Sequence, residues 1–364
     1  MQTKKFKDIE LSRLGMGNMR LPVTKDDKID YEKAQEIIDY AYDNGINYYD
    51  TAYVYHHHDS EAFLGQALKK YPRESYYIAT KFFILSNPNY KEVFEEQLQK
   101  LQTDYIDFYL IHGIFDHTFQ RYIDCGCIEY FKEQQRLGRI KYLGFSSHAA
   151  PENLEIFASL HDWDFAQIQI NYFDWLYSTA KEEYEILTKR NIPVMVMEPV
   201  RGGKLAELNK PAEQLLKSSQ GAWSISSWAF RWLMSLDNVQ VVLSGMSTMD
   251  QIEDNVSTFT NGKALNKEEE KLLFDACELY NKYLIIPCTA CRYCCDDCPM
   301  EINIPEYLKV FNDYEIDRFS GLNGIENIES KNGPKECIGC GACQGHCPQN
   351  IEIPEIMTKL AELI

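Results

Sequence analysis

Two cysteine runs in the last fifth of the chain share one spacing. Nine of the 12 cysteines lie between Cys288 and Cys347, and each run reads C-x2-C-x2-C-x3-C followed by proline. This spacing is typical of bacterial two-cluster ferredoxins, in which the fourth cysteine of each run binds the other cluster. We therefore predict two [4Fe–4S] clusters. The expected ligands are Cys288, Cys291, Cys294 and Cys347 for one cluster, and Cys337, Cys340, Cys343 and Cys298 for the other.

The alternative use of these thiols is a pair of zinc sites. Zinc sites usually take paired cysteines rather than four at this spacing, so iron–sulfur clusters are favoured. Cys295 is one thiol more than the pattern needs, and we expect it to pack rather than to bind iron. Pro305 and Pro354 each stand at the start of an apolar run with helical spacing. This repeat favours a mainly helical ferredoxin-like module over a compact sheet.

A second group of residues could transfer a proton. Asp50, Lys81 and His112 each follow a short apolar run, and Tyr55 comes shortly after Asp50. A phenol has a pKa of about 10, and a neighbouring ammonium lowers that value because it stabilises the phenolate. An aspartate beside the lysine would keep the lysine charged. Such a tyrosine can give a proton to a carbonyl oxygen while hydride reaches the carbon.

Short β-like runs alternate with longer amphipathic segments over most of the chain, which predicts a parallel sheet. Helices are expected between the strands, for example at Tyr31–Asn44 and Tyr90–Leu101. Eight βα units in about 250 residues favour a closed barrel, and no G-x-G-x-x-G motif supports a Rossmann domain. The predicted strands are Arg13–Met16, Ile46–Tyr49, Tyr76–Thr80, Tyr105–Ile111, Tyr142–Phe145, Phe165–Ile170, Val194–Met197 and Val239–Leu243.

Active sites of such barrels lie at the carboxyl ends of the strands, so Asp50, Tyr55, Lys81 and His112 are expected to converge there. Each residue alone has a structural explanation, because the chain holds 24 tyrosines and a single histidine after a strand often only makes a hydrogen bond. The four together favour catalysis. We predict an α/β fold, a (β/α)8 TIM barrel over residues 1–265. A connecting helix over 266–287 and a small, mainly helical ferredoxin-like iron–sulfur domain over 288–364 are expected to follow.

Composition limits the partners. Lys and Arg number 37 against 55 Asp and Glu, which gives a net charge of −18. An acidic surface argues against nucleic acid and anionic membranes as partners. No apolar run reaches the roughly 18 residues of a transmembrane helix, and no secretory signal follows Met1. We expect a cytoplasmic protein that acts on small molecules or binds a basic protein.

The chain resembles the aldo-keto reductase superfamily between about Leu11 and Asn255. Its D-T-A-x-x-Y motif begins at Asp50 and ends at Tyr55, and Lys81 and His112 follow in the family's order. The cysteine runs make the chain similar to the subgroup with a C-terminal iron–sulfur domain. The resemblance implies that Tyr55 is the general acid, that Lys81 lowers its pKa and that Asp50 pairs with Lys81. It also implies that His112 orients the carbonyl and stabilises the developing oxyanion.

The resemblance implies a bound nicotinamide cofactor, NADP or NAD. Ser146 and Gln167 match the residues that hold the carboxamide in the family. Ser147 stands where the family has asparagine, and Met197 stands where an aromatic ring normally stacks. The segment from Ser244 onward matches the loop for the adenosine half of the cofactor. The candidate binding residues in that segment are Gly245, Ser247, Gln251 and Asn255.

This chain lacks the positively charged residues that many family members use to bind the cofactor's phosphates. They have Arg or Lys near the positions of Thr248 and Gln251, and this chain has neither. Arg201 and Lys204 could supply charge, and Gly203 permits close backbone approach. The alternative for these residues is a solvated loop. The choice between NADP and NAD stays open.

The sequence therefore predicts an oxidoreductase that interconverts an aldehyde or ketone and its alcohol, with Tyr55 as general acid or base. One alternative is an iron–sulfur protein that exchanges electrons with a ferredoxin or a reductase partner. Another is a nucleotide-binding redox sensor. His56, His57 and His58 are expected to line the substrate mouth or to face solvent, because adjacent loop residues cannot all face one metal ion. The substrate itself is not predicted.

Overall fold

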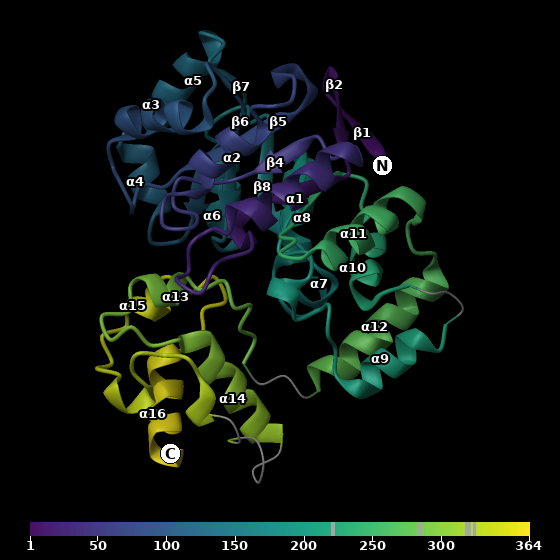
Figure 1. The fold of residues 1–364 in the computed structure, drawn as a ribbon, viewed down its shortest axis with the longest axis vertical. Coiled ribbons are helices and arrows are strands. Elements are labelled where there is room, and N and C mark those ends of the chain that lie inside the picture. Colours follow the sequence, from purple (N-terminus) through teal and green to yellow (C-terminus); the bar gives the residue numbers. More distant parts are fainter. Residues whose placement is uncertain (220–222, 283–285, 317–321, 323–324) are drawn as a thin grey trace. The chain divides into compact units, whose positions relative to one another are not determined.

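The computed structural model describes residues 1–219, 223–282, 286–316, 322 and 325–364. Eight parallel strands close into a barrel (Figure 1), and the order β10-β3-β4-β5-β6-β7-β8-β9 makes neighbours of strands that follow one another in the chain. The barrel strands are β3 (Leu14–Gly17), β4 (Tyr48–Asp50), β5 (Tyr77–Phe82), β6 (Ile106–Ile114), β7 (Ile140–Ser147), β8 (Phe165–Gln169), β9 (Val194–Met197) and β10 (Val239–Ser244).

The barrel strands are mostly buried on both faces, because helices cover one side and the other strands cover the other. Every residue of β4, β6 and β10 is buried. All eight predicted strands are confirmed, with ends that shift by a few residues. The predicted strand Arg13–Met16, for example, forms as Leu14–Gly17.

An antiparallel hairpin that the sequence analysis missed precedes the barrel. Strand β1 (Thr3–Phe6) pairs with β2 (Ile9–Ser12). The buried ring of Phe6 lies 5.5 Å from the ring of Phe108 and 5.1 Å from that of Tyr142, between centroids. Both rings belong to the early part of their strands, so the hairpin packs on the end of the barrel where the strands begin.

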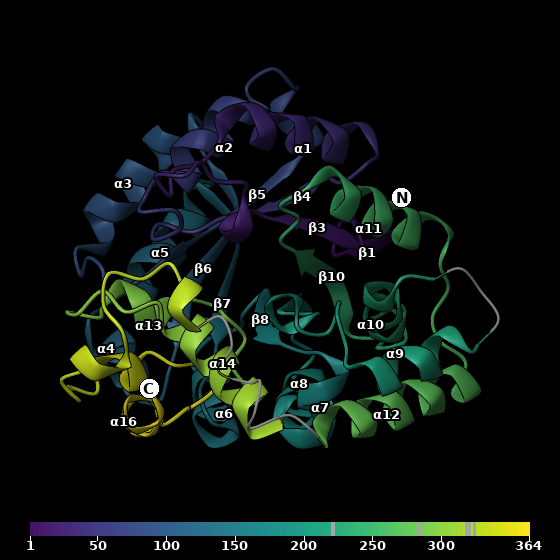
Figure 2. The same cartoon turned by 60° about the horizontal axis from the view of Figure 1, so that its bottom comes forward.

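Helices surround the strands in the first part of the chain (Figure 2). The predicted helix Tyr90–Leu101 has these bounds, and it ends where Gln102 turns left-handed at φ 53°. Two helices follow β8: a short one capped by Asn171 ends at Tyr177, and the next begins at Ala180. The helices are α1 (Tyr31–Asp43), α2 (Ser60–Leu68), α3 (Tyr90–Leu101), α4 (Phe119–Asp124), α5 (Cys127–Arg136), α6 (Pro151–Ala158), α7 (Tyr172–Tyr177), α8 (Ala180–Lys189), α10 (Ile225–Leu233) and α11 (Met249–Asn261).

The chain forms two compact units that do not follow chain order. The barrel unit is Met1–Pro199 with Ser226–Lys267, and the second unit joins Val200–Ile225 to Glu268–Ile364. The second unit contains α9 (Lys210–Lys217), α12 (Lys267–Asn281) from its second residue on, α13 (Tyr293–Asp296), α14 (Ile304–Ile316), α15 (Ala342–Gly345) and α16 (Ile353–Leu363).

The second unit is mainly helical, as the paired proline-led patterns predicted. Helices α14 and α16 supply much of its apolar core, in which Leu308, Met357 and Leu360 are almost wholly buried. The strand-like pairing found among its described residues is one bridge between Ile302 and Asn332. Within the described part of the chain, none of the helices has the length and apolar character that a membrane crossing requires.

Candidate active site

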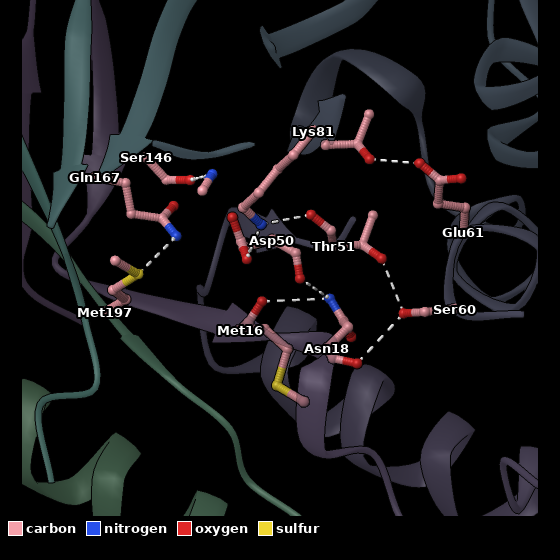
Figure 3. Close-up of polar contacts among 12 residues, drawn as sticks. Met16, Asn18, Asp50, Thr51, Ser60, Glu61, Lys81, Ser146, Gln167 and Met197 are labelled. Carbon is pink, nitrogen blue, oxygen red and sulfur yellow. Dashed lines mark hydrogen bonds and ion pairs between the residues drawn. The ribbon is translucent and has the colours of Figure 1, made fainter. Parts of the chain in front are cut away.

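The carboxyl ends of β4, β5 and β6 bring polar side chains together. Asp50 is the last residue of β4, and Lys81 lies near the end of the neighbouring strand β5. Lys81 Nζ donates to Asp50 Oδ1 and to the backbone oxygen of Thr51, each at 2.6 Å (Figure 3). The ammonium therefore ties two strand ends to the segment that leads to Tyr55.

Lys81 and Asp50 form a buried ion pair, with side chains that are 0% and 4% exposed. Burial lowers the pKa of Lys81 and raises the pKa of Asp50, because each charge loses its hydration, and the charge of each partner opposes the change. Removing one member of such a pair typically costs about 3–5 kcal/mol, because the other charge stays buried and unpaired. Each residue therefore depends on the other to stay ionised.

Tyr55 and His112 complete the group. Lys81 Nζ lies 4.9 Å from the centroid of the Tyr55 ring, and the His112 ring meets that ring edge-on at 5.9 Å. Burial, with the charges of Lys81 and His148, holds the pKa of His112 well below its ordinary 6.5, so the imidazole is neutral near pH 7. Its buried Nδ1 has no hydrogen-bond partner among the described residues. The structure thus gathers all four residues predicted to transfer a proton.

A left-handed turn follows the tyrosine. His56, His57 and His58 have φ angles of 49°, 53° and 72°. Such angles cost roughly 1–2 kcal/mol for each residue that carries a Cβ. His56 Nε2 accepts from the backbone N–H of Leu21 at 3.3 Å, whereas His57 Nε2 lies 3.3 Å from an Asp27 carboxylate oxygen. The imidazoles diverge, and across the described residues no three His, Cys, Asp or Glu side chains build a site for one metal ion.

Buried polar side chains to which the sequence analysis gave no role support these strand ends. Asn18 Nδ2 donates to the backbone oxygen of Asp50 at 2.9 Å (Figure 3). Glu61 Oε1 accepts from the Thr80 hydroxyl at 2.5 Å and from Gln97 Nε2 at 2.7 Å. Burial raises the pKa of Glu61 to about 7, although both hydrogen bonds lower it. Asn18 carries no motif signal, whereas Glu61 follows closely on the D-T-A-x-x-Y motif.

The residues predicted to hold the carboxamide lie at the ends of β7, β8 and β9. Ser146 Oγ accepts from the backbone N–H of Gly113 at 2.8 Å. Ser147 Oγ instead accepts from a local backbone N–H at 3.1 Å. Gln167 Nε2 lies 3.7 Å from Met197 Sδ (Figure 3), and the buried Gln167 Oε1 has no hydrogen-bond partner in the described part of the chain. An open amide acceptor beside a thioether fits a nicotinamide, which offers an amide donor and a flat ring.

The predicted adenosine loop joins β10 to α11. The backbone N–H of Ser247 donates to Gln251 Oε1 at 2.7 Å. Asn255 Nδ2 donates to Ser244 Oγ at 3.0 Å, in a buried contact. The side chains of Gln251 and Asn255 thus hold the loop in one shape before the helix begins.

Arg20 is a cation beside this loop that the sequence analysis missed. Its backbone oxygen accepts from the Ser247 hydroxyl at 2.6 Å. A Cβ on Gly245 would lie 3.0 Å from Arg20 Cβ, so a larger residue at 245 would crowd it. The Arg20 guanidinium lies 3.6 Å from a carboxylate oxygen of Glu198, which follows β9. A short 3-10 turn after β3 places it there, and no motif in the sequence marks that turn.

Arg201, Gly203 and Lys204 fall in the second unit rather than with the barrel strands. The Arg201 side chain is almost wholly buried, and its Nη2 donates to the backbone oxygen of Pro287 at 3.1 Å and to Gln349 Oε1 at 2.8 Å. These contacts join the Arg201 guanidinium to Pro287, which precedes Cys288, and to Gln349, which lies two residues after Cys347. A role for Arg201, Gly203 and Lys204 toward cofactor phosphates stays a prediction.

The eight cysteines of the two runs line two cavities in the second unit. Each cavity collects three cysteines of one run and the fourth cysteine of the other. Cys295 lines neither and packs against the apolar core. The first cavity holds Cys288, Cys291, Cys294 and Cys347, and the second holds Cys298, Cys337, Cys340 and Cys343.

The arrangement of these thiols fits a polynuclear cluster better than a single ion. Tetrahedral zinc with bonds of about 2.3 Å needs its sulfurs about 3.8 Å apart, and no such convergence of three ligands exists among the described residues. The thiols instead surround a cavity, as a cubane that offers one iron to each ligand requires. A backbone N–H, from Ala290, also lies 3.4 Å from Cys288 Sγ.

Comparison with known proteins gives two matches along the chain. Residues 13–276 match the model of the Aldo/keto reductase family, and residues 287–352 match that of the 4Fe-4S dicluster domain. The chain is 28% identical to the uncharacterized oxidoreductase YqkF of Bacillus subtilis, over 73% of this chain and 92% of that one. It is 25% identical to the NADH-specific methylglyoxal reductase of Escherichia coli, over 69% and 90%. The solved aldo-keto reductase AKR11C1 of Bacillus halodurans, in its holo form, is 29% identical with a TM-score of 0.64, over 76% and 96%.

Proposed function

Because the chain belongs to the aldo/keto reductase family and carries a 4Fe-4S dicluster domain, we propose that it interconverts a small carbonyl compound and its alcohol. Bound NADPH or NADH supplies the hydride. The observation that carries the proposal is the buried Lys81–Asp50 pair, whose ammonium lies 4.9 Å from the Tyr55 ring beside a neutral imidazole. This is the arrangement that a proton donor needs at a carbonyl oxygen.

Tyr55 gives its hydroxyl proton to the carbonyl oxygen as the carbon is reduced. The step leaves a phenolate, and the Lys81 ammonium stabilises that negative charge. Asp50 keeps Lys81 protonated despite its burial. His112 is neutral, so its ring can donate one hydrogen bond to the substrate oxygen and orient it without adding a competing positive charge.

The cofactor residues act by binding and orientation. Gln167, whose buried Oε1 has no hydrogen-bond partner among the described residues, and Ser146 would hold the carboxamide of a bound nicotinamide by hydrogen bonds. Met197 presents its sulfur to the nicotinamide ring in place of an aromatic side chain. The loop that carries Gly245, Ser247, Gln251 and Asn255 binds the adenosine half, with Arg20 as a nearby positive charge.

The test replaces Tyr55 by phenylalanine. We expect Tyr55→Phe to slow NADPH or NADH oxidation by about 100-fold or more with small aldehydes, among them methylglyoxal, because general acid catalysis contributes about that much. Cofactor affinity should stay within about twofold, since the phenol is not used for binding. Tyr53→Phe is the matched control, because the Tyr53 hydroxyl donates to Glu96 Oε2 at 3.0 Å. Unchanged turnover in Tyr55→Phe would exclude the assignment.

We propose further that the second unit holds two [4Fe–4S] clusters, each bound by three cysteines of one run and the fourth cysteine of the other. Each cluster would carry one electron.

A second candidate function, electron exchange with a redox protein, is favoured by the surface at the second cluster cavity. Cys340 is exposed there, and the neighbouring Ile338 is 63% exposed. Adding NADPH or NADH under argon and recording the cluster spectrum tests internal electron flow. Clusters that stay oxidised would leave carbonyl reduction standing and exclude electron flow from the nicotinamide cofactor to the clusters.

A further inference from the structure

A second pair of thiols lies in the barrel unit, apart from the cluster cysteines. Cys125 and Cys127 flank Gly126 between α4 and α5. Cys125 Sγ lies 3.5 Å, and Cys127 Sγ 3.7 Å, from one atom, the backbone oxygen of Tyr122. Gly126 has a φ of 78°, which glycine adopts without strain and which turns the chain back on itself. Both sulfurs therefore lie close to the same carbonyl oxygen.

The two thiols differ in access and acidity. Cys125 is partly exposed, whereas Cys127 is fully buried. A hydrogen bond from the Cys127 thiol lowers the pKa of Cys125 to about 6, helped by the backbone N–H groups of Cys125 and Cys127 and opposed by burial and the charge of Asp124. The same contact and burial raise the pKa of Cys127 far above its usual range. Cys125 is thus the accessible thiolate, and Cys127 holds the proton beside it.

We propose that Cys125 and Cys127 form a redox-active dithiol that exchanges with small-molecule disulfides of the glutathione type. The Cys125 thiolate attacks one sulfur of the disulfide, forms a mixed disulfide and releases one thiolate. Cys127 loses its proton and attacks the Cys125 sulfur, which forms the Cys125–Cys127 bond and releases the second thiolate. Two protein thiols are oxidised, and one external disulfide is reduced to two thiols.

The sequence around the pair allows a direct readout. Trypsin cleaves after Arg121 and Lys132, so one peptide carries both cysteines and no other. The holoprotein is equilibrated under argon with mixtures of reduced and oxidised glutathione, quenched with acid, alkylated, digested and weighed. We expect this peptide to lose both alkylation sites and two hydrogens as the oxidised share rises, and dithiothreitol to restore both sites. A peptide that stays doubly alkylated in fully oxidised glutathione would overturn the proposal.

Single substitutions test the order of attack. Cys127→Ser should accumulate a glutathione adduct on Cys125, because the resolving thiol is gone. Cys125→Ser should show no adduct on the buried Cys127 under the same conditions. Cys277, which is also fully buried, is the matched reference for a thiol that geometry protects. Equal adduct formation on Cys127 in Cys125→Ser would refute the assignment of Cys125 as the attacking thiol.

Discussion

Replacing Lys81 by methionine isolates the electrostatic part of the proposed mechanism. Methionine keeps a long unbranched side chain and removes the ammonium. Unit charges 4.9 Å apart, the distance from Lys81 Nζ to the Tyr55 ring centroid, interact by about 3 kcal/mol at an effective dielectric constant of about 20. Losing that stabilisation of the phenolate should slow proton transfer about 100-fold. A single-turnover measurement of cofactor oxidation reports the step directly.

Two control variants separate this effect from loss of folding. Lys81→Met leaves Asp50 buried without its partner, which destabilises the fold by about 3–5 kcal/mol. The double variant Lys81→Met with Asp50→Asn removes both charges, so it should regain stability while staying about 100-fold slow. Asp50→Asn alone leaves a lysine whose pKa burial lowers, so its rate should fall with rising pH earlier than the parent's.

One result would exclude a role of the Lys81 ammonium in proton transfer. If the folded double variant transfers hydride within about threefold of the parent, with equal cofactor affinity, the ammonium does not act on the tyrosine. The cluster formed by Asp50, Tyr55, Lys81 and His112 would then have a structural role, and the proton would come from another group.

Three further predictions follow from contacts near the site and the cysteines. Burial raises the pKa of Glu61 from 4.5 to about 7, so between these pH values the folded protein binds a proton on Glu61 that the unfolded chain does not. The free energy of unfolding should therefore fall by about 3 kcal/mol as pH rises through that window. Glu61→Gln should lose this pH dependence when denaturant midpoints are measured across the window, and an equal pH dependence in both proteins would contradict the prediction. His57→Gly should be about 1 kcal/mol more stable than His57→Ala, and so unfold at a higher temperature, because glycine adopts φ 53° without strain; the reverse order would exclude strain at this turn. Cys298→Ser should change the same electron paramagnetic resonance signal of the reduced protein as Cys340→Ser, whereas Cys295→Ser should change neither signal, and any other pairing would refute crossed ligation.

The barrel and the convergence of Asp50, Lys81 and His112 could be predicted from the sequence because both depend on local sequence patterns. Asp50, Lys81 and His112 each sit at or near the end of a run of apolar residues that can only be a buried strand. The parallel order of the strands then brings those ends to one edge. The cysteine spacing is equally local, since each run is a short loop.

What the sequence does not predict depends on contacts between distant segments. From the sequence, Arg201 could supply charge to the cofactor phosphates or lie in a solvated loop. Its guanidinium is instead buried against Pro287 and Gln349, far away in the chain. Arg20 and Asn18 lie in a short turn without a motif, and only the closed barrel brings them to Ser247 and to the end of β4. Such residues need the tertiary fold to be identified.

The assembly of the second unit from two separate chain segments has a practical consequence for any attempt to study the barrel without the cysteine-rich segment. Val200–Ile225 leaves the barrel strands after β9, packs with the cysteine-rich segment and returns to form α10. A truncation before the cysteines would strip that excursion of its partners and expose the buried Arg201 in the surviving fragment. Low turnover in such a fragment would reflect misfolding rather than the loss of iron. Point substitutions of the cysteines therefore test the role of iron more directly.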